Sequence, residues 1–175
     1  VCDSDEYTMS AVQSLNGLLD SGATSDASCT RTLAGVLPDT LTRSQRGIIA
    51  VGTASSCLDS FGSHLFMYIR QGSDDTREVV LRRLWYTPDL GVDIVFSEAC
   101  EVYEHGYDIT FDADRGRVLT ASCPVNQRQY SVPLIMTKSM LGLMQCTPVS
   151  DPESRRHYLT LMRQLGQSSV HLIGQ

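Results

Sequence analysis

The sequence lacks most of the features that assign a chain to a known class. It contains none of the GxSxG, GxGxxG, HExxH or P-loop motifs that accompany common catalytic and nucleotide-binding sites. Its only asparagines, Asn16 and Asn126, lie outside any N-x-S/T glycosylation site. No apolar run approaches the ~20 residues that a membrane-spanning helix requires. We therefore expect no cofactor and no membrane span, and no motif names a reaction.

Basic residues are few and almost uniform in type. The 175 residues carry a formal net charge of -6, and Lys138 is the single lysine among 14 basic residues. A net negative chain is repelled by phosphate backbones, so we expect no binding to nucleic acid. Because arginine pairs with a carboxylate through two hydrogen bonds, the bias fits an arginine-rich interface, although codon usage in a GC-rich genome is the simpler explanation.

Six cysteines are spread too widely for a zinc site. They are Cys2, Cys29, Cys57, Cys100, Cys123 and Cys146, with no CxxC pair among them. Their even number permits three disulfides, whose pairing the sequence does not specify, and this favours a secreted or extracytoplasmic location. Free cysteines also serve as small buried hydrophobes, so the redox state stays open. The start at Val1 rather than Met is expected of a processed product or a fragment.

The composition is that of a folded globular protein. Hydrophobic residues make up 42% of the chain and charged residues 19%, a balance typical of chains with little disorder. A length of 175 residues is enough for one core and too short for two ordinary domains. We therefore expect a single α+β domain over residues 1–175.

Helices are expected at the front of the chain. The acidic residues 3–6 suit a helix N-terminus, and apolar residues from Met9 to Leu19 follow at helical spacing until Ser21-Gly22. A second helix is expected over residues 26–36. A third is expected from Thr42, because residues 42–45 form a capping-box pattern.

Period-two alternation predicts strands in the middle of the chain. It runs through residues 65–69, 78–86, 92–96, 101–105, 107–111, 117–121 and 129–135, joined by short turns. The segment 112–116 ends at a glycine, as expected for a hairpin loop. Strands this close in sequence predict an antiparallel meander.

The clearest local signal lies near the C-terminus. Residues 150–153 form a capping box with Pro152 in the first turn, and Gly166 predicts the helix end. The apolar stripe of this helix consists of Tyr158, Leu161, Met162 and Leu165. Residues 170–173 are expected to add an edge strand. The sequence thus predicts an α+β fold with N-terminal helices, an antiparallel meander of about five or six strands, and a C-terminal helix packed on the sheet.

Two groups of arginines are the candidate interaction residues. Arg82 and Arg83 precede Trp85, an arrangement that stacks on bases or binds acidic peptides, although a structural Trp is the simpler interpretation. Arg155 and Arg156 oppose the dipole at the start of the last helix. We therefore expect an acidic partner to hold them there, unless that face is merely solvated.

Other clusters give weaker signals. The pattern Asp112-x-Asp114-x-Gly116 begins like a Ca²⁺ loop but lacks the later ligands, so we expect a turn. Cys100 and His105 have opposite parity in a strand, which argues against a local pair of nucleophile and base. The four histidines have no metal-ligand spacing. No catalytic or metal-binding residue is predicted.

Three functions stay open. The absence of a catalytic constellation favours a non-enzymatic protein-interaction or structural module, such as an assembly subunit or a secreted or viral recognition domain, with a protein partner and an unspecified oligomeric state. The first alternative is a carrier of a small hydrophobic ligand, in a pocket between the sheet and the C-terminal helix. That pocket would be lined by Met136, Met140, Met144 and Met162. The second alternative is a hydrolase with a nonlocal Cys/His or Asp pair.

Overall fold

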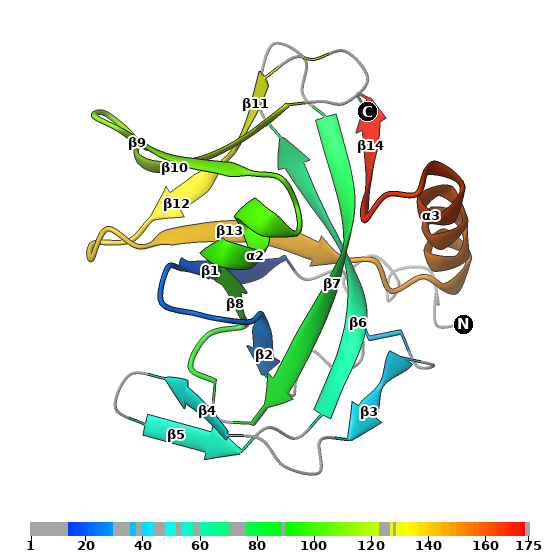
Figure 1. Cartoon of the computed structure of the whole chain (residues 1–175), viewed down its shortest axis with the longest axis horizontal. Coiled ribbons are helices and arrows are strands. Elements are labelled where there is room, and N and C mark those ends of the chain that lie inside the picture. Colours follow the sequence, from blue (N-terminus) through cyan, green and yellow to red (C-terminus); the bar gives the residue numbers. More distant parts are fainter. Residues whose placement is uncertain are drawn as a thin grey trace, which may run out of the picture.

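A computed structural model gives the fold. It describes residues 14–29, 36–37, 40–43, 48–51, 54–57, 60–70, 76–88, 90–122, 127 and 129–173. The strands are β1 (Leu15–Asp20), β2 (Ala27–Cys29), β3 (Thr42–Arg43), β4 (Ile48–Val51), β5 (Ala54–Cys57), β6 (Ser60–Arg70), β7 (Thr76–Thr87), β8 (Ile94–Ser97), β9 (Asp108–Asp112), β10 (Gly116–Ser122), β11 (Gln129–Val132), β12 (Leu134–Met136), β13 (Gly142–Pro148) and β14 (Ser169–Ile173). Within this part of the chain the helices are α2 (Glu98–Tyr103) and α3 (Pro152–Leu165) (Figure 1).

Six of the strands close into a barrel. Around the ring, β1 lies between β13 and β8, β2 joins β8 to β7, and β6 follows β7 and returns to β13. The β1–β8 and β2–β7 pairs are parallel, and the other four pairs are antiparallel. The predicted antiparallel meander is therefore wrong, because neighbours in the barrel are distant in sequence. Leu18, for example, pairs with Val95 on one side and Leu143 on the other.

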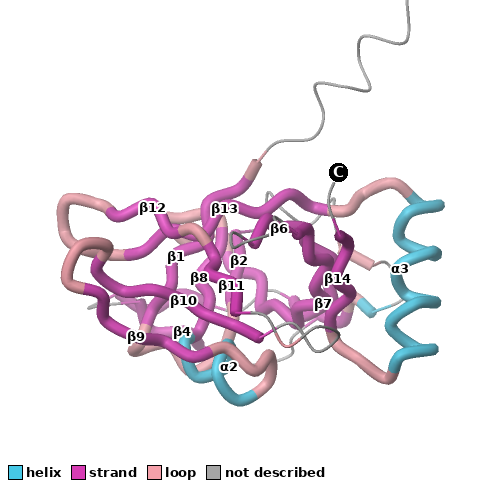
Figure 2. Tube along the Cα trace, turned by 90° about the horizontal axis from the view of Figure 1, so that it is seen from above, coloured by secondary structure: helices cyan, strands magenta, loops and turns pink. Residues whose placement is uncertain are grey.

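The remaining strands surround this barrel. β12 extends the sheet beside β13, β3 beside β6, and β14 beside β7. β9, β10 and β11 form a three-stranded sheet, and β4 and β5 form a two-stranded sheet. Figure 2 places α3 at one end of the molecule, and the β9–β10 and β12–β13 hairpins at the opposite end.

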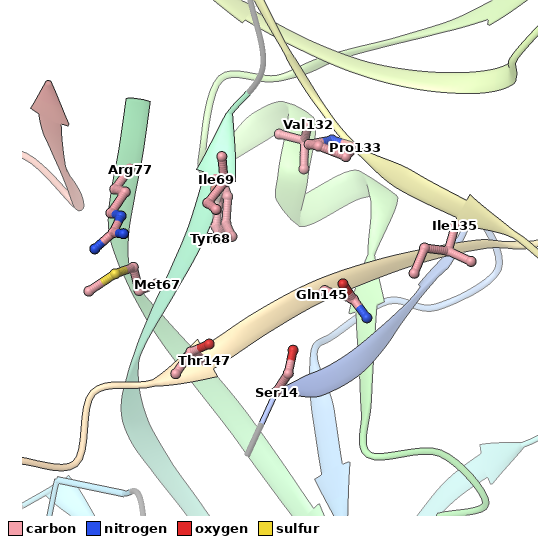
Figure 3. A pocket seen from close by; sticks show the side chains of 10 residues that line it. All are labelled: Ser14, Met67, Tyr68, Ile69, Arg77, Val132, Pro133, Ile135, Gln145 and Thr147. Atoms are coloured by element: carbon pink, nitrogen blue, oxygen red, sulfur yellow. The ribbon is translucent and has the colours of Figure 1, made fainter. Parts of the chain in front are cut away.

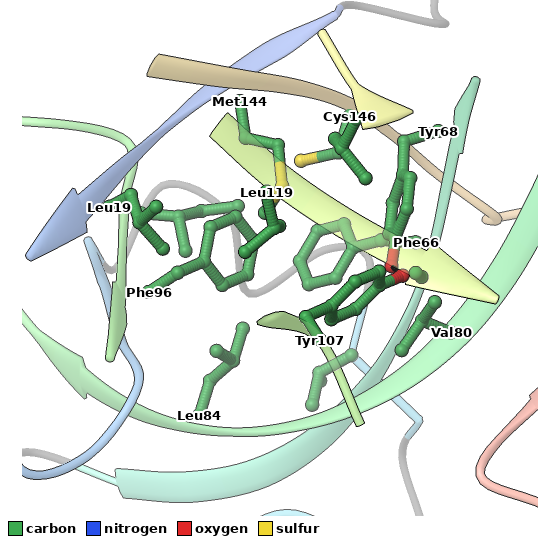
Figure 4. Packing of buried hydrophobic residues seen from close by; sticks show 14 of the residues in the cluster. Leu19, Phe66, Tyr68, Val80, Leu84, Phe96, Tyr107, Leu119, Met144 and Cys146 are labelled. Carbon is green, nitrogen blue, oxygen red and sulfur yellow. Dashed lines mark hydrogen bonds between the residues drawn. The ribbon is translucent and has the colours of Figure 1, made fainter. Parts of the chain in front are cut away.

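Large apolar side chains fill the barrel (Figure 4). The rings of Phe66 and Phe96 meet edge to face with their centroids 6.2 Å apart, and Leu19 and Met144 are fully buried beside them. Each fully buried side chain of this size contributes roughly 1.5–3 kcal/mol. Gly17 is required here, because a Cβ at this position would overlap the ring of Phe96.

A second apolar layer joins α3 to the outside of the barrel. Met162 of α3 packs with Leu65, Val79 and Val170, all of them buried. The predicted helix is confirmed: Asp151 caps it by accepting the Ser154 N–H at 2.8 Å, and Gly166 ends it in the left-handed conformation at φ 62°. The predicted stripe extends one residue too far, because Leu165 is 58% exposed.

The N-terminal helices are wrong wherever the structure describes those residues. Residues 15–20, 27–29, 42–43 and 48–51 are all strands. The predicted helix ending at Ser21-Gly22 failed because β1 has neighbours on both sides, so its apolar residues do not alternate simply. The front of that segment, residues 1–13, lies outside the described residues.

One predicted strand is instead the helix α2. Residues 101–105 carry an alternating pattern, yet Ser97 caps a helix over residues 98–103 by accepting the Cys100 N–H at 3.4 Å. Glu98 and Glu101 lie in its first turn, where negative charge is favoured. The β9–β10 hairpin, in contrast, is confirmed with its loop at residues 113–115.

Candidate functional site

The end of β1 presents a carboxylate in a fixed turn. Asp20 is the last residue of β1, and its Oδ1 accepts the backbone N–H of Gly22 at 2.8 Å. Its side chain is partly exposed, and within the described residues its second oxygen accepts no hydrogen bond. β1 runs parallel to β8 here, with Asp20 opposite Ser97.

Two buried hydrogen bonds fasten the segment after Asp20. The hydroxyl of Ser97 donates to the carbonyl of Ala23 at 2.7 Å, and the Ser97 N–H donates to Asp26 Oδ1 at 2.8 Å. Ser97 is fully buried and also caps α2, so one residue ties the β1–β2 loop to the start of that helix. Burial raises the pKa of Asp26, although nearby Arg82 and the Ser97 N–H oppose this shift. The loop that holds Asp20 is therefore preorganised.

α2 is in turn held by an ion pair inside the barrel. Arg82 Nη1 and Nη2 lie 2.7 and 2.9 Å from the two carboxylate oxygens of Glu101, and both side chains are at most 1% exposed. Burial raises the pKa of Glu101 to about 7, while Arg82 opposes the shift. Burial disfavours the charge on Arg82, but Glu101 outweighs it and the pKa of Arg82 stays above its usual value. Polar contacts thus connect β7, α2 and the Asp20 turn.

Two other described carboxylates, Glu78 and Asp112, are engaged by several or buried contacts. Glu78 is buried and accepts the hydroxyl of Tyr107 at 2.5 Å. Asp112 accepts the N–H groups of Asp114 and Arg115, both at 2.9 Å, which confirms the predicted turn. Asp20 therefore combines a fixed position, partial exposure and an oxygen that no described residue satisfies.

The structure separates the candidate interaction residues of β7. Arg82 points inward and pairs with Glu101, so it is not a surface contact. Arg83 is exposed and its guanidinium lies 4.6 Å from the centre of the Phe61 ring. Trp85 is half-buried against the same ring, at 4.5 Å between centroids. Arg83 and Trp85 thus share a face, as alternation requires.

Arg155 binds two backbone carbonyls at the start of α3. Its Nε donates to the carbonyl of Val149 at 2.8 Å and its Nη1 to that of Val36 at 3.3 Å. These contacts help to fasten the start of α3, and the acidic partner expected for Arg155 and Arg156 stays a prediction. Arg156 is exposed.

The cysteines offer no activated thiolate among the residues that the structure describes in detail. Cys146 is buried, and burial raises its pKa to about 12. Burial also raises the pKa of Cys100, and its backbone carbonyl accepts the His105 N–H at 3.2 Å. Cys29 is buried, whereas Cys2, Cys57 and Cys123 fall outside the residues whose side chains are described. Within the described contacts, neither the Cys100 thiol nor the Cys146 thiol is hydrogen-bonded to a histidine side chain.

A groove of about 560 Å³ opens between β6 and β12 (Figure 3). Tyr68, Ile69, Pro133 and Ile135 line it, with Arg77 at its edge. Of the methionines expected in a carrier pocket, Met144 and Met162 are buried in the two cores, and Met140 is 62% exposed. They do not converge on one cavity.

Three comparisons with known proteins were made. No family model, no curated protein and no solved structure matches the chain. Among the described residues, no helix is long and apolar enough to cross a membrane, and no three His, Cys, Asp or Glu side chains gather as metal ligands.

Sequence reasoning missed the residues of this site. Asp20 was assigned to a helix end, Asp26 to a helix start and Glu101 to a strand, and Ser97 was not singled out. The available signal was the apolar run Leu18-Leu19 followed by Asp20-Ser21-Gly22, because an Asp that bonds to the backbone two residues on marks a strand-to-turn boundary.

Proposed function

We propose that the chain is one half of a hydrolase in which two Asp20 carboxylates, one from each of two copies, form an acid–base pair. The observation that carries this proposal is the Asp20 turn, which ends a barrel strand and holds a partly exposed carboxylate in one orientation. This is the hydrolase with an Asp pair that the sequence left open, with the pair formed between chains.

In this proposal the second carboxyl group of the pair is the Asp20 of a second copy. No second carboxylate is hydrogen-bonded to Asp20 within the described residues. Soluble homo-oligomers are most often two-fold symmetric, and a residue near the axis then meets its own copy. Two Asp20 side chains placed in this way make a symmetric site.

In a close pair of carboxyl groups, one acts as general base and the other as general acid. Like charges about 3 Å apart do not both ionise, so the pair shares one proton. The ionised Asp20 takes a proton from a water molecule, whose oxygen attacks the substrate carbonyl carbon. The protonated Asp20 donates its proton to the carbonyl oxygen. The intermediate then collapses: the Asp20 that took the proton from water donates it to the leaving nitrogen, and the other Asp20 takes a proton from a hydroxyl of the intermediate, which restores both groups.

Peptide bonds are the proposed substrate. An extended peptide binds by adding a strand to an unpaired sheet edge. β4 and β5 form a two-stranded sheet whose outer edges have no partner strand in the described part of the chain. This hairpin and the β1–β2 loop both lie on the side of the barrel away from α3 (Figure 1).

Cleavage of a peptide library tests the proposal. We expect the protein to hydrolyse peptides at mildly acidic pH, and Asp20→Asn to lower the rate by at least about 100-fold, because the amide cannot act as acid or base. Asp108→Asn is the matched control, since Asp108 is also exposed and lies on β9. Equal cleavage by Asp20→Asn and the wild type, read by mass spectrometry, would reject the assignment.

A protein-interaction module is the second candidate. Its supporting observation is a set of exposed apolar side chains on neighbouring hairpins, including Phe111 at 84% and Met140 at 62% exposure. Binding without any Asp20-dependent hydrolysis would favour this function over the first.

A further inference from the structure

The turn between β12 and β13 is an unusual surface feature. Residues 138–141 are all exposed, and two of them, Met140 and Leu141, are large and apolar. Met140 has φ 61°, in the left-handed region that non-glycine residues rarely adopt. Such outliers persist where the surroundings fix them, and they cluster at functional surfaces.

Three hydrogen bonds fix this turn. The Thr137 N–H donates to Leu141 O at 2.9 Å, the Met140 N–H to Thr137 O at 3.0 Å, and the Leu141 N–H to Thr137 Oγ1 at 3.1 Å. The β9–β10 hairpin supports it from one side, because a Cβ at Gly116 would lie 3.5 Å from the Met140 methyl carbon. The apolar side chains are therefore presented in a defined position rather than on a loose loop.

The register of β13 places this turn beside Asp20. β13 runs antiparallel to β1, with Gly142 opposite Leu19, so Leu141 reaches the level of Asp20. Adjacent strands lie about 4.8 Å apart. The turn therefore continues past the end of β1 at the same side of the barrel (Figure 1).

We infer that residues 138–141 and the Asp20 turn form one self-association surface, which docks a second copy of this chain. The inference rests on the proposed function, since an Asp pair needs a two-fold axis near Asp20. Charge is compatible with self-pairing despite the net charge of -6: Lys138 and Arg115 are exposed on these hairpins together with Asp114. In a two-fold contact, a residue away from the axis meets a different residue of the other copy, so Lys138 of one copy can pair with Asp114 of the other.

Sedimentation velocity over a concentration series tests the surface. We expect the wild type to dimerise, and Met140→Asp and Leu141→Asp each to weaken the dimer at least about tenfold, because a charge would be buried in the contact. Leu165→Asp is the control, since Leu165 is 58% exposed on α3 at the opposite end of the molecule. Thermal unfolding checks that each variant is folded.

The single lysine gives a second, independent readout. A short amine-reactive cross-linker is expected to join two copies through Lys138, seen as a Lys138–Lys138 peptide by mass spectrometry. The Lys138→Arg variant should lose that product. A wild-type monomer, or a dimer that the two Asp variants leave intact, overturns the inference. If the protein dimerises through this surface but hydrolyses no peptide, the self-association surface is confirmed and the proposed hydrolase is rejected.

Discussion

The two described helices are held to the barrel by different physical means. α3 has fourteen residues and packs through Met162 against an apolar layer. α2 has six residues and is held through Glu101, which pairs with Arg82 inside the barrel. Apolar burial stabilises without fixing direction, whereas paired hydrogen bonds define orientation. The helix beside Asp20 is thus the one whose position is set by directed contacts.

The largest loss of stability is expected when the ion pair between Arg82 and Glu101 is broken. Replacing Arg82 by Met leaves the Glu101 carboxyl group buried without its partner, and we expect the free energy of unfolding to fall by about 3–5 kcal/mol at pH about 7. Arg83→Met, one residue along the same strand and exposed, is the control and should change it by less than about 0.5 kcal/mol. Urea unfolding measures both. If the two variants are equally stable, the ion pair does not anchor α2.

Apolar burial under α3 should give the next largest effect. Met162→Ala removes a side chain that is 5% exposed, and we expect a loss of about 2–5 kcal/mol. Leu165→Ala, on the same helix but exposed, should cost little. Neither change should alter hydrogen exchange in residues 21–26, which α3 does not contact through any described hydrogen bond. Faster exchange there in Met162→Ala would remove the distinction between the two helices.

Stability should also fall as pH rises toward neutrality. The folded protein holds the pKa of Glu101 at about 7, above its usual value of 4.5, and burial raises that of Asp26 in the same direction. A group with a raised folded pKa contributes stability that is fully present below the unfolded pKa and is lost as pH passes the folded one. We therefore expect the free energy of unfolding to decrease between pH about 4.5 and 7. Glu101→Gln should flatten this decrease, and an unchanged slope in the variant would contradict the assignment.

Local sequence signals identified the parts of the fold that depend on neighbouring residues. The α3 caps at Asp151 and Gly166 and the turn before Gly116 were predicted because each is formed by side chains a few residues apart. β6 and β7 were predicted from alternation. In each case the physical cause lies within the segment itself.

Barrel closure and the candidate site depend on contacts that no local pattern contains. Asp26 and Ser97 are 71 residues apart and meet only after β1 inserts between β8 and β13. The partner of Arg82 was unpredictable for the same reason, because Glu101 was assigned to a strand. Among these residues only Asp20 had a local sequence signal, the turn pattern Asp20-Ser21-Gly22. The helical spacing of Leu15 and Leu19 led to a helix prediction instead.

The substitution with the smallest expected loss of stability, Ser97→Ala, should have a large effect on the candidate site. Ser97→Ala removes the hydroxyl that binds the Ala23 carbonyl and caps α2, at a cost of about 1 kcal/mol. Asp151→Ala removes the corresponding cap of α3 at a similar cost. We expect only Ser97→Ala to speed hydrogen exchange in residues 21–26 and to lower Asp20-dependent hydrolysis, because only that cap also fastens the turn. Equal exchange in the two variants would mean that Asp20 keeps its position without Ser97.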